Sequence, residues 1–578
     1  MSGRSKRQGG FVLLLATVGG IVAMFAVGLP GASASVSVMV TNGGGGTGAS
    51  WKFAPTINAP WAQGDPDAAG LDSPSPNLVG LCRSTLFNTT NPYAPTTNVD
   101  AINGDQPNNS GFSNFGCTTA QNETTVVVNP TNPLNIVAGT NDYRVCCDFT
   151  GLNDGTGWAY YSRDGGTTWT NVQVPGLTAE TGGQGNFQRT DSAGDPALAF
   201  GPDGTLYYAN IVFSRASPAS GVAVSISKDG GATWSAPTMV TYNDSAVFFN
   251  DKEWIAAGPN GSVVLTWTRF NSGAQGVKPG YKESPIVMAV SQNSGQSWNR
   301  ISSPVSDATR PYDQGSMPAF DSNGNLYVAY EATTPESGYT QDGTVVARST
   351  DLGQHFTQTT LGRVYDDNDC YPFYAGRQTL TGEHFRLNSY PSISVDPTNG
   401  HVAVTWADDR GTGNCGTGAS SFVGTTNAKT VLSTSNNGTS YTSPAVISAG
   451  DTVFPSVAAN NGKYVVSYYT RAYSPATPVC TAVTGNPPNT PPANGGIPVC
   501  LDYAARSSSD GFASELRLTT ESSNPYIQFA DGSFIGDYSQ IALGSNGVAH
   551  PVWTDFRGNP NPGGTLANQD AYTQSFTP

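Results

Sequence analysis

The stretch Ser227-Lys228-Asp229-Gly230-Gly231-Ala232-Thr233-Trp234 has the form Ser-x-Asp-x-Gly-x-x-Trp, and the chain repeats it. Four other segments follow the pattern, two of them with Asn for Asp, two with Phe or Tyr for Trp, and one with Thr for Ser: residues 162–169, 291–298, 349–356 and 434–441. Successive copies begin 58 to 85 residues apart. A period of this size indicates a repeat architecture.

The octet has a physical logic that places it in a tight turn. The Asp or Asn side chain accepts hydrogen bonds from backbone N–H groups of the turn. The Gly permits a positive φ there, and the aromatic ring packs the turn against the sheet. We therefore expect each octet to join two strands.

A second set of turn signals divides the chain into seven units. Asn-Gly and Asp-Gly are strong hairpin signals, and most units contain one: 202–204, 259–261, 322–324, 398–400, 460–462 and 545–547, with 130–133 as a Pro-bounded equivalent. The units begin near residues 123, 195, 253, 317, 390, 454 and 537. This pattern predicts an all-β fold, a β-propeller of four-stranded blades, with seven blades favoured and six as the alternative. The last unit is one strand short, so residues just before 123 are expected to complete it.

The region before the repeats has two parts. Residues 1–34 read as a signal peptide, with a basic start, an apolar stretch and a small-residue cleavage site at Ala32-Ser33-Ala34. An uncleaved membrane anchor is the alternative, and no later segment is apolar enough to span a membrane. Residues 35–116 are interpreted as a low-complexity linker and N-terminal extension, and 117–578 as the propeller.

The eight cysteines of an exported chain suggest disulfides. We expect Cys370 to pair with Cys415 and Cys480 with Cys500. The remaining four would pair among themselves in an order left open: Cys82 and Cys117 with Cys146 and Cys147. Metal binding by cysteine is the other interpretation, but no Cys-x-x-Cys motif supports it.

The composition argues against nucleic-acid binding and limits the cofactors that can be expected. The 578 residues carry a formal charge of −15 and only 12% are charged, against roughly 25% in an ordinary soluble protein. An acidic chain that is poor in Lys is unsuited to nucleic acid. No cofactor is expected except a structural Ca²⁺, for which acidic loops offer oxygen ligands, although no EF-hand spacing is present.

The order of strands in each unit predicts which face carries chemistry. The octets and the Asn-Gly turns share one face, so the loops after the second strands lie on the other. Six of the seven units place Arg at that edge, and the fourth has Glu331 instead. We expect Arg269, Arg410 and Arg557 to face a central pocket and pair with an acidic sugar. Alternatively, each Arg bridges to an Asp of the neighbouring blade.

The octet is the pattern called the Asp box, and over about residues 120–578 the chain resembles the sialidase-like β-propellers. The segment Asp537-Tyr538-Ser539-Gln540-Ile541-Ala542-Leu543 resembles the last-blade segment of sialidases. That resemblance implies that Tyr538 is the nucleophile, activated by Glu253 or Glu331. It further implies an acid, Asp148 or Asp154, and substrate contacts by the three arginines and Asp537.

Two features depart from the sialidase pattern. The first unit reads Asn122-Glu123-Thr124-Thr125-Val126, where sialidases have an Arg-Ile-Pro-like segment. Sialidases also have six blades. Tyr538 is therefore either a catalytic nucleophile or a structural tyrosine that hydrogen-bonds between blades.

These observations predict a secreted, monomeric, sialidase-like glycoside hydrolase that acts on an extracellular acidic glycan. A non-catalytic propeller that binds glycan or protein through its Arg/Asp-lined face is the alternative. A structural cell-surface module with bound Ca²⁺ is a third interpretation.

Overall fold

The computed structural model describes most of the chain from residue 120 onward and three short stretches before it. The described residues are 15–18, 21–24, 99–101, 120–142, 155–214, 217–271, 282–300, 304–335, 341–366, 369–374, 377–412, 415, 422, 424–477, 480, 497–525, 534–557 and 569–578. Cys82, Cys117, Cys146 and Cys147 lie outside them, as do the cleavage site and the acid candidates Asp148 and Asp154.

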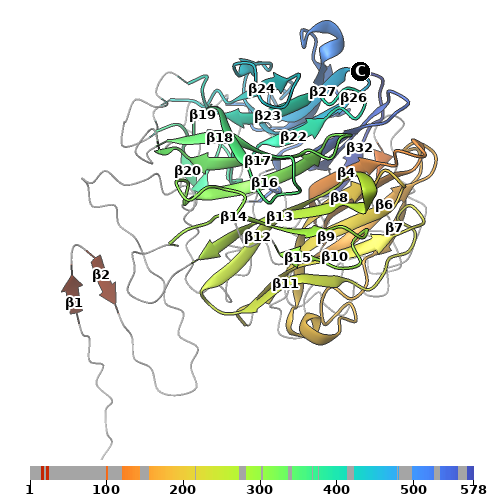
Figure 1. The fold of residues 1–578 in the computed structure, drawn as a ribbon. Coiled ribbons are helices and arrows are strands. Elements are labelled where there is room, and N and C mark those ends of the chain that lie inside the picture. Colours follow the sequence, from red (N-terminus) through yellow and green to blue (C-terminus); the bar gives the residue numbers. More distant parts are fainter. Residues whose placement is uncertain are drawn as a thin grey trace, which may run out of the picture.

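Seven four-stranded antiparallel sheets form a β-propeller (Figure 1). The first four blades are β4 (Gln121–Val128), β5 (Ile136–Asp142), β6 (Thr156–Ser162) and β7 (Thr170–Gln173); β8 (Ser192–Phe200), β9 (Leu206–Phe213), β10 (Ala219–Ser227) and β11 (Thr238–Asp244); β12 (Phe248–Ala257), β13 (Val263–Asn271), β14 (Ile286–Ser291) and β15 (Asn299–Arg300); β16 (Asp313–Phe320), β17 (Leu326–Thr333), β18 (Asp342–Ser349) and β19 (Thr357–Val364). The last three are β22 (Ser392–Val395), β23 (Val402–Asp408), β24 (Lys429–Ser435) and β25 (Ala445–Val446); β26 (Thr452–Asn460), β27 (Lys463–Thr470), β28 (Asp502–Ser507) and β29 (Leu516–Arg517); β30 (Gln540–Leu543), β31 (Ala549–Asp555), β32 (Asp570–Thr573) and β3 (Val99–Asp100).

A few short elements lie outside the blades. They are the paired strands β1 (Leu15–Val18) and β2 (Ile21–Met24), the paired strands β20 (Phe373–Tyr374) and β21 (Arg377–Gln378), and the 3-10 helices η5 (Gly185–Arg189), η6 (Pro259–Gly261) and η8 (Ser508–Asp510). Over the described residues, no helix has the length and apolar character that crossing a membrane requires.

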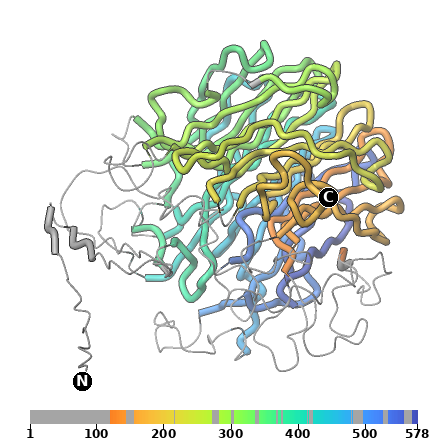
Figure 2. Tube along the Cα trace, turned by 90° about the horizontal axis from the view of Figure 1, so that it is seen from below, coloured from red at the N-terminus to blue at the C-terminus, as the bar shows by residue number. Residues whose placement is uncertain are grey.

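The predicted count of seven blades is confirmed, and the expected closure of the ring is observed. Strand β3 pairs with β32, with Asp100 opposite Tyr572, and the Ala101 N–H donates to the Ala571 carbonyl at 2.8 Å. Figure 2 shows the first blade in orange beside the last in dark blue. The fourth strand of blade 7 thus comes from the region that was interpreted as a linker and extension.

The octets form the turns between third and fourth strands. In the copy at 227–234, the Asp229 carboxylate accepts hydrogen bonds from the Ser227 hydroxyl and the Thr233 N–H, each at 2.9 Å. The Gly231 N–H donates to Ser227 Oγ, and its φ is 96°. The Trp234 ring packs edge-on against Tyr208, 5.4 Å between centroids. The local geometry therefore follows the physical logic of the motif.

The fifth copy needs a correction of one residue. The prediction placed its Ser and Asp equivalents at Thr434 and Asn436. In the structure Ser435 Oγ accepts from the Gly438 N–H at 2.9 Å, and Asn437 accepts from Thr439 and Ser440. The turn is one residue shorter, because Gly438 follows Ser435 by three positions and not by four.

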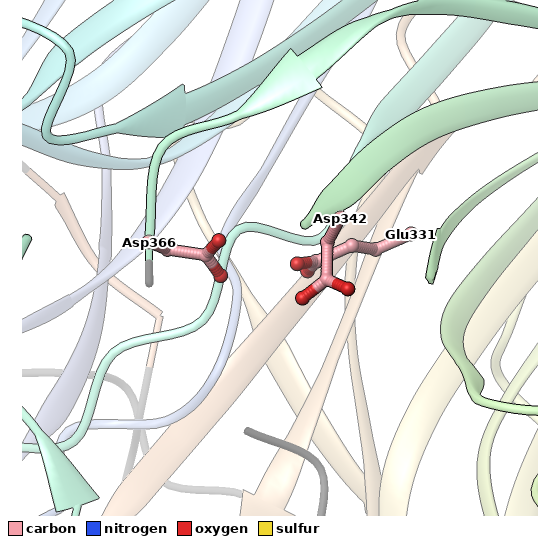
Figure 3. A group of neighbouring side chains, drawn as sticks. All are labelled: Glu331, Asp342 and Asp366. Atoms are coloured by element: carbon pink, nitrogen blue, oxygen red, sulfur yellow. The ribbon is translucent and has the colours of Figure 1, made fainter. Parts of the chain in front are cut away.

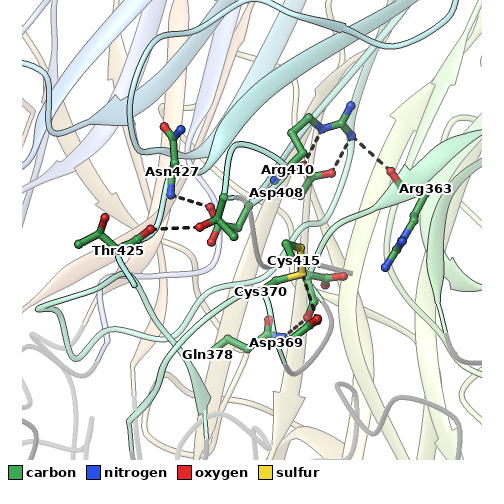
Figure 4. Close-up of a disulfide and its surroundings, with 12 residues drawn as sticks. Arg363, Asp369, Cys370, Gln378, Asp408, Arg410, Cys415, Thr425 and Asn427 are labelled. Carbon is green, nitrogen blue, oxygen red and sulfur yellow. Dashed lines mark hydrogen bonds and ion pairs between the residues drawn. A yellow bond between two sulfur atoms is a disulfide. The ribbon is translucent and has the colours of Figure 1, made fainter. Parts of the chain in front are cut away.

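Buried tryptophans and two disulfides stabilise the blades. Trp267, Trp406 and Trp553 occupy corresponding second strands with at most 1% of their surface exposed. The predicted disulfides Cys370–Cys415 and Cys480–Cys500 are confirmed. The first holds the segment between blades 4 and 5, close to the Arg410–Asp408 ion pair (Figure 4).

Candidate functional site

The inner strands of five blades carry a bulge near their start. At each bulge the register shifts, and one residue adopts a positive φ: Glu123, Asp195, Lys252, Gly315 and Phe454. A bulge re-aims side chains and interrupts pairing, and positive φ is unfavourable for residues other than Gly. The fold repeats this strained feature around its axis, where it gathers charged groups from separate blades.

Lys252 is the centre of a buried ionic cluster. Its Nζ lies 2.7 Å from Asp537 Oδ2, 3.1 Å from Asp195 Oδ2 and 3.3 Å from Glu123 Oε1. Arg386 binds the same Asp537 carboxylate through Nε and Nη2, at 2.8 and 2.7 Å. All five residues are buried. Because they come from blades 1, 2, 3 and 7 and from the segment before blade 5, the cluster ties distant parts of the ring together.

The cluster shifts the pKa values of two of its carboxyl groups in opposite directions. Burial, reinforced by the neighbouring charge of Asp195, raises the pKa of Glu123 well above its usual range. For Asp537, burial acts in the same upward direction, but Arg386 and Lys252 outweigh it and hold the pKa well below the usual range. Asp537 is therefore an anion at neutral pH, while Glu123 holds its proton more strongly than an ordinary glutamate.

An axial pocket adjoins this cluster, and the space between its lining atoms amounts to about 550 Å³ when the adjoining open solvent is included. Its lining comes from blades 3 to 7: Lys252, Glu253, Trp254, Gly315, Ser316, Met317, Asn388, Tyr390, Pro391, Ser392, Phe454, Pro455, Asp537, Tyr538 and Ser539. The position of Gly315 is constrained, since a Cβ there would lie 2.3 Å from the Tyr390 ring. No arginine is among the described residues that line the pocket.

Tyr538 is partly buried at one wall of the pocket. Its ring packs edge-on against Trp254 with 5.2 Å between centroids, and its hydroxyl donates to the Pro196 carbonyl at 3.2 Å. Burial and the nearby carboxyl groups of Glu123 and Asp195 raise the phenol pKa well above its usual value. The phenol is therefore neutral unless a base removes its proton.

Glu253 is the exceptional polar group of the pocket. Its residue is 1% exposed, and neither carboxyl oxygen has a hydrogen-bond partner on another described residue. Burial, then the charges of Asp195 and Asp251, raise its pKa well above the usual value. A buried polar group without a partner costs about 1–3 kcal/mol, so such a group at a pocket wall is suited to meet a ligand.

The structure places the predicted site residues in four different settings. Tyr538, Glu253 and Asp537 meet at the axial pocket. Arg410 and Arg557 do not line it, because each is held by an aspartate two positions earlier on its own strand, Asp408 or Asp555, through two contacts of 2.7–2.8 Å. Both arginines also contact the preceding blade: Arg410 donates to the Arg363 carbonyl at 3.3 Å, and Arg557 lies 3.7 Å from the Glu521 carboxylate. The alternative of a bridge to a neighbouring blade is therefore met in part by Arg557, with Glu in place of Asp.

Arg269 and Glu331 also lie away from the pocket lining. The Arg269 guanidinium lies over the Phe248 ring, 5.5 Å from its centroid. Glu331 belongs to a separate carboxylate group on blade 4.

Arg386 was missed by the sequence reasoning. It lies in the segment between blades 4 and 5, which carries neither an octet nor a strand-end pattern, and it reaches Asp537 from 151 positions away. Lys252 and Asp195 carried a signal, because charged residues stand near the start of these first strands, as Asp195 in one and Asp251-Lys252-Glu253 in the other. Their mutual contacts could not be inferred, since the bulges that aim them at the axis have no sequence signature.

No protein-family model and no curated protein matches the chain. Among solved structures, it is similar to a protein of unknown function from Dyadobacter fermentans (TM-score 0.39, 15% identity, 65% of this chain and 94% of that one). It is also similar to a Hadza microbial sialidase (TM-score 0.39, 12% identity, 73% of each chain). An α-L-arabinofuranosidase from Fusarium graminearum gives a TM-score of 0.37 at 13% identity, over 65% of this chain and 92% of that one. Likenesses this distant do not bear on activity.

Proposed function

We propose that the chain is a glycoside hydrolase whose axial pocket binds one glycosyl unit of an extracellular glycan. The observation that carries the proposal is the Glu253 carboxyl group, buried without a hydrogen-bond partner among the described residues, in the wall that also holds Tyr538. A carboxyl group with a raised pKa in a pocket is a typical acid or base catalyst. The octet turns support the finer assignment to the Asp-box, sialidase-like propellers.

Tyr538 and Glu253 are assigned complementary roles. Tyr538 attacks the anomeric carbon while the Glu253 carboxylate takes its proton. The phenol therefore stays neutral until it attacks, and no phenolate forms beside the Glu253 carboxylate. A base works best when its pKa lies near the operating pH, and burial moves the pKa of Glu253 in that direction. The proton for the departing sugar oxygen would come from a separate acid, for which Asp148 and Asp154 stay predictions.

The pocket favours an uncharged glycosyl unit over an acidic one. A sugar carboxylate needs an available cation, preferably a guanidinium. Lys252 already contacts three carboxylates, and Arg410 and Arg557 are each held by their own aspartate. We therefore expect neutral glycosides to be cleaved faster than sialosides, in place of the acidic glycan predicted from the sequence.

Hydrolysis of fluorogenic glycosides tests the proposal. The purified chain is assayed against neutral glycosides and a sialoside over a range of pH, beside Tyr538→Phe and Glu253→Gln. Matched controls are Tyr242→Phe on the outer strand β11 and Glu521→Gln, whose side chain is 61% exposed. Loss of turnover in the two pocket variants alone is expected. Wild-type chain that cleaves none of the glycosides contradicts the proposal.

A non-catalytic glycan-binding propeller is the second candidate. It is favoured by one contact: the Tyr538 hydroxyl already donates to Pro196, as a structural tyrosine would. Glycan binding by calorimetry without turnover, unchanged in Tyr538→Phe, is its distinguishing result. In either case we propose a secreted monomer, in keeping with the two disulfides.

A further inference from the structure

Three carboxylates from three segments of blade 4 converge away from the axial pocket. Glu331 lies near the end of β17, Asp342 begins β18, and Asp366 follows β19. One oxygen from each lies within 4.8 Å of the others, and all three residues are buried. In Figure 3 the carboxylates of Glu331 and Asp342 lie side by side, and that of Asp366 faces them.

Two threonine hydroxyls point to a ligand at this group. Thr344 lies directly opposite Glu331 in the β17–β18 ladder, and Thr333 directly opposite Asp342. Directly opposite residues carry their side chains on the same face of a sheet, so both threonines share the face of the carboxylates. Their hydroxyl oxygens are buried and have no hydrogen-bond partner among the described residues. Buried hydroxyls are normally bonded, and here a bound ion or its water would supply the missing partner.

We propose that Glu331, Asp342 and Asp366, with the hydroxyls of Thr344 and Thr333, form a Ca²⁺ site. The donors are all oxygens, which hard cations prefer, whereas the group contains no His or Cys for zinc. Ligands on opposite sides of Ca²⁺ are separated by roughly 4.6–5.2 Å, twice the Ca–O distance. The three carboxylate oxygens lie within 4.8 Å of one another, which is compatible with that separation. The preference for Ca²⁺ rests on its flexible coordination by several protein oxygens, whereas Mg²⁺ usually keeps several waters.

A bound ion would connect blade 4 to the segment that reaches the axis. Asp366 belongs to the connection between blades 4 and 5, and its carbonyl accepts a hydrogen bond from Gln378. Further along this connection, Arg386 and Asn388 bind Asp537. Bound Ca²⁺ therefore joins two strands of blade 4 to the segment that completes the ionic cluster. The inference stands apart from the proposed glycosidase activity.

Calcium titration of the metal-stripped full-length chain tests the site, by calorimetry and by the melting temperature with and without Ca²⁺. We expect saturable binding and a rise in melting temperature. Asp342→Asn should weaken binding at least about tenfold. Thr344→Val should weaken it by a smaller factor, and because this hydroxyl bonds no other described residue, the variant keeps the contacts of the fold.

Thr554→Val is the matched control, since Thr554 is another buried threonine, on blade 7, whose hydroxyl lacks a partner among the described residues. It should bind Ca²⁺ like the wild type. Absence of Ca²⁺ binding by the wild type overturns the site, as does equal affinity in wild type, Asp342→Asn and Thr344→Val. Tighter binding of Mg²⁺ than of Ca²⁺ overturns the choice of ion. If Asp342→Asn does not fold, Thr344→Val decides alone.

Discussion

The Lys252 ammonium group lies 2.7 Å from Asp537 Oδ2 and so joins the third blade to the seventh. These blades are not neighbours in the ring, so the ion pair must lie near the axis, where inner strands from all sides approach one another. The pair is buried. Lys252 also contacts Glu123 and Asp195, and Asp537 also contacts Arg386. Because Lys252 and Asp537 also line the pocket, the same ion pair holds two blades together and shapes the pocket wall.

Lys252→Met should destabilise the protein by about 3–5 kcal/mol, because it leaves buried carboxylates without their shared cation. Denaturant unfolding followed by tryptophan fluorescence measures the change. Lys463→Met is the matched control, since the Lys463 ammonium group donates to the terminal carbonyl of Pro578 and not to a buried carboxylate. A loss below about 1 kcal/mol in Lys252→Met, the level of an exposed ion pair, would show that the cluster carries little stability.

His550 should make stability depend on pH below neutrality. Burial lowers its pKa from 6.5 to about 4, so the unfolded chain takes up this proton more readily than the folded one. The stabilisation is complete above pH 6.5 and is lost as the pH falls toward 4, by roughly 3 kcal/mol in all. His550→Gln should remove this part of the slope when the free energy of unfolding is measured between about pH 4 and 7. An unchanged slope would assign it to other groups.

The activity should rise with pH through the raised pKa of Glu253, because only the carboxylate can take the Tyr538 proton. The rising limb of kcat/KM should therefore lie above pH 4.5, the ordinary pKa of a glutamate side chain. Glu253→Gln should lower kcat/KM by about 10²–10⁴ and flatten this limb. A limb of unchanged position in Glu253→Gln would exclude Glu253 as the base.

Ala101→Pro should open the closure between the two ends of the chain. It removes the N–H that donates to the Ala571 carbonyl at 2.8 Å and leaves β32 with a weaker partner. We expect a loss of stability of about 1–3 kcal/mol, because the Ala571 carbonyl loses its partner, and faster hydrogen exchange in β32 (Asp570–Thr573). Ala101→Ser keeps the N–H and serves as control. Equal stability of the two variants would mean that β3 contributes little to closing the ring.

Local patterns were sufficient for the blades and insufficient for the site. Asp229 and Gly231 bind within their own octet, so the turn could be recognised from eight residues. The arginines show why local patterns did not place the site. Arg410 forms an ion pair with Asp408, two positions away, and so is not held ready for a ligand. Arg386 binds Asp537 across 151 positions, and no local pattern indicates that contact.

The sequence alone determined the repeat, the seven four-stranded blades and two disulfides, because each depends on segments close in the chain or on a repeated length. The structure decided that the closing strand is Val99–Asp100. Only the tertiary structure decided that Lys252, Asp537 and Arg386 meet at the axis and that Glu253 and Tyr538 line the same pocket. Those positions follow from inner-strand bulges and from the approach of distant blades around the axis. The energies of such contacts depend on burial and on the distances between charges, and both are set only once the ring has closed.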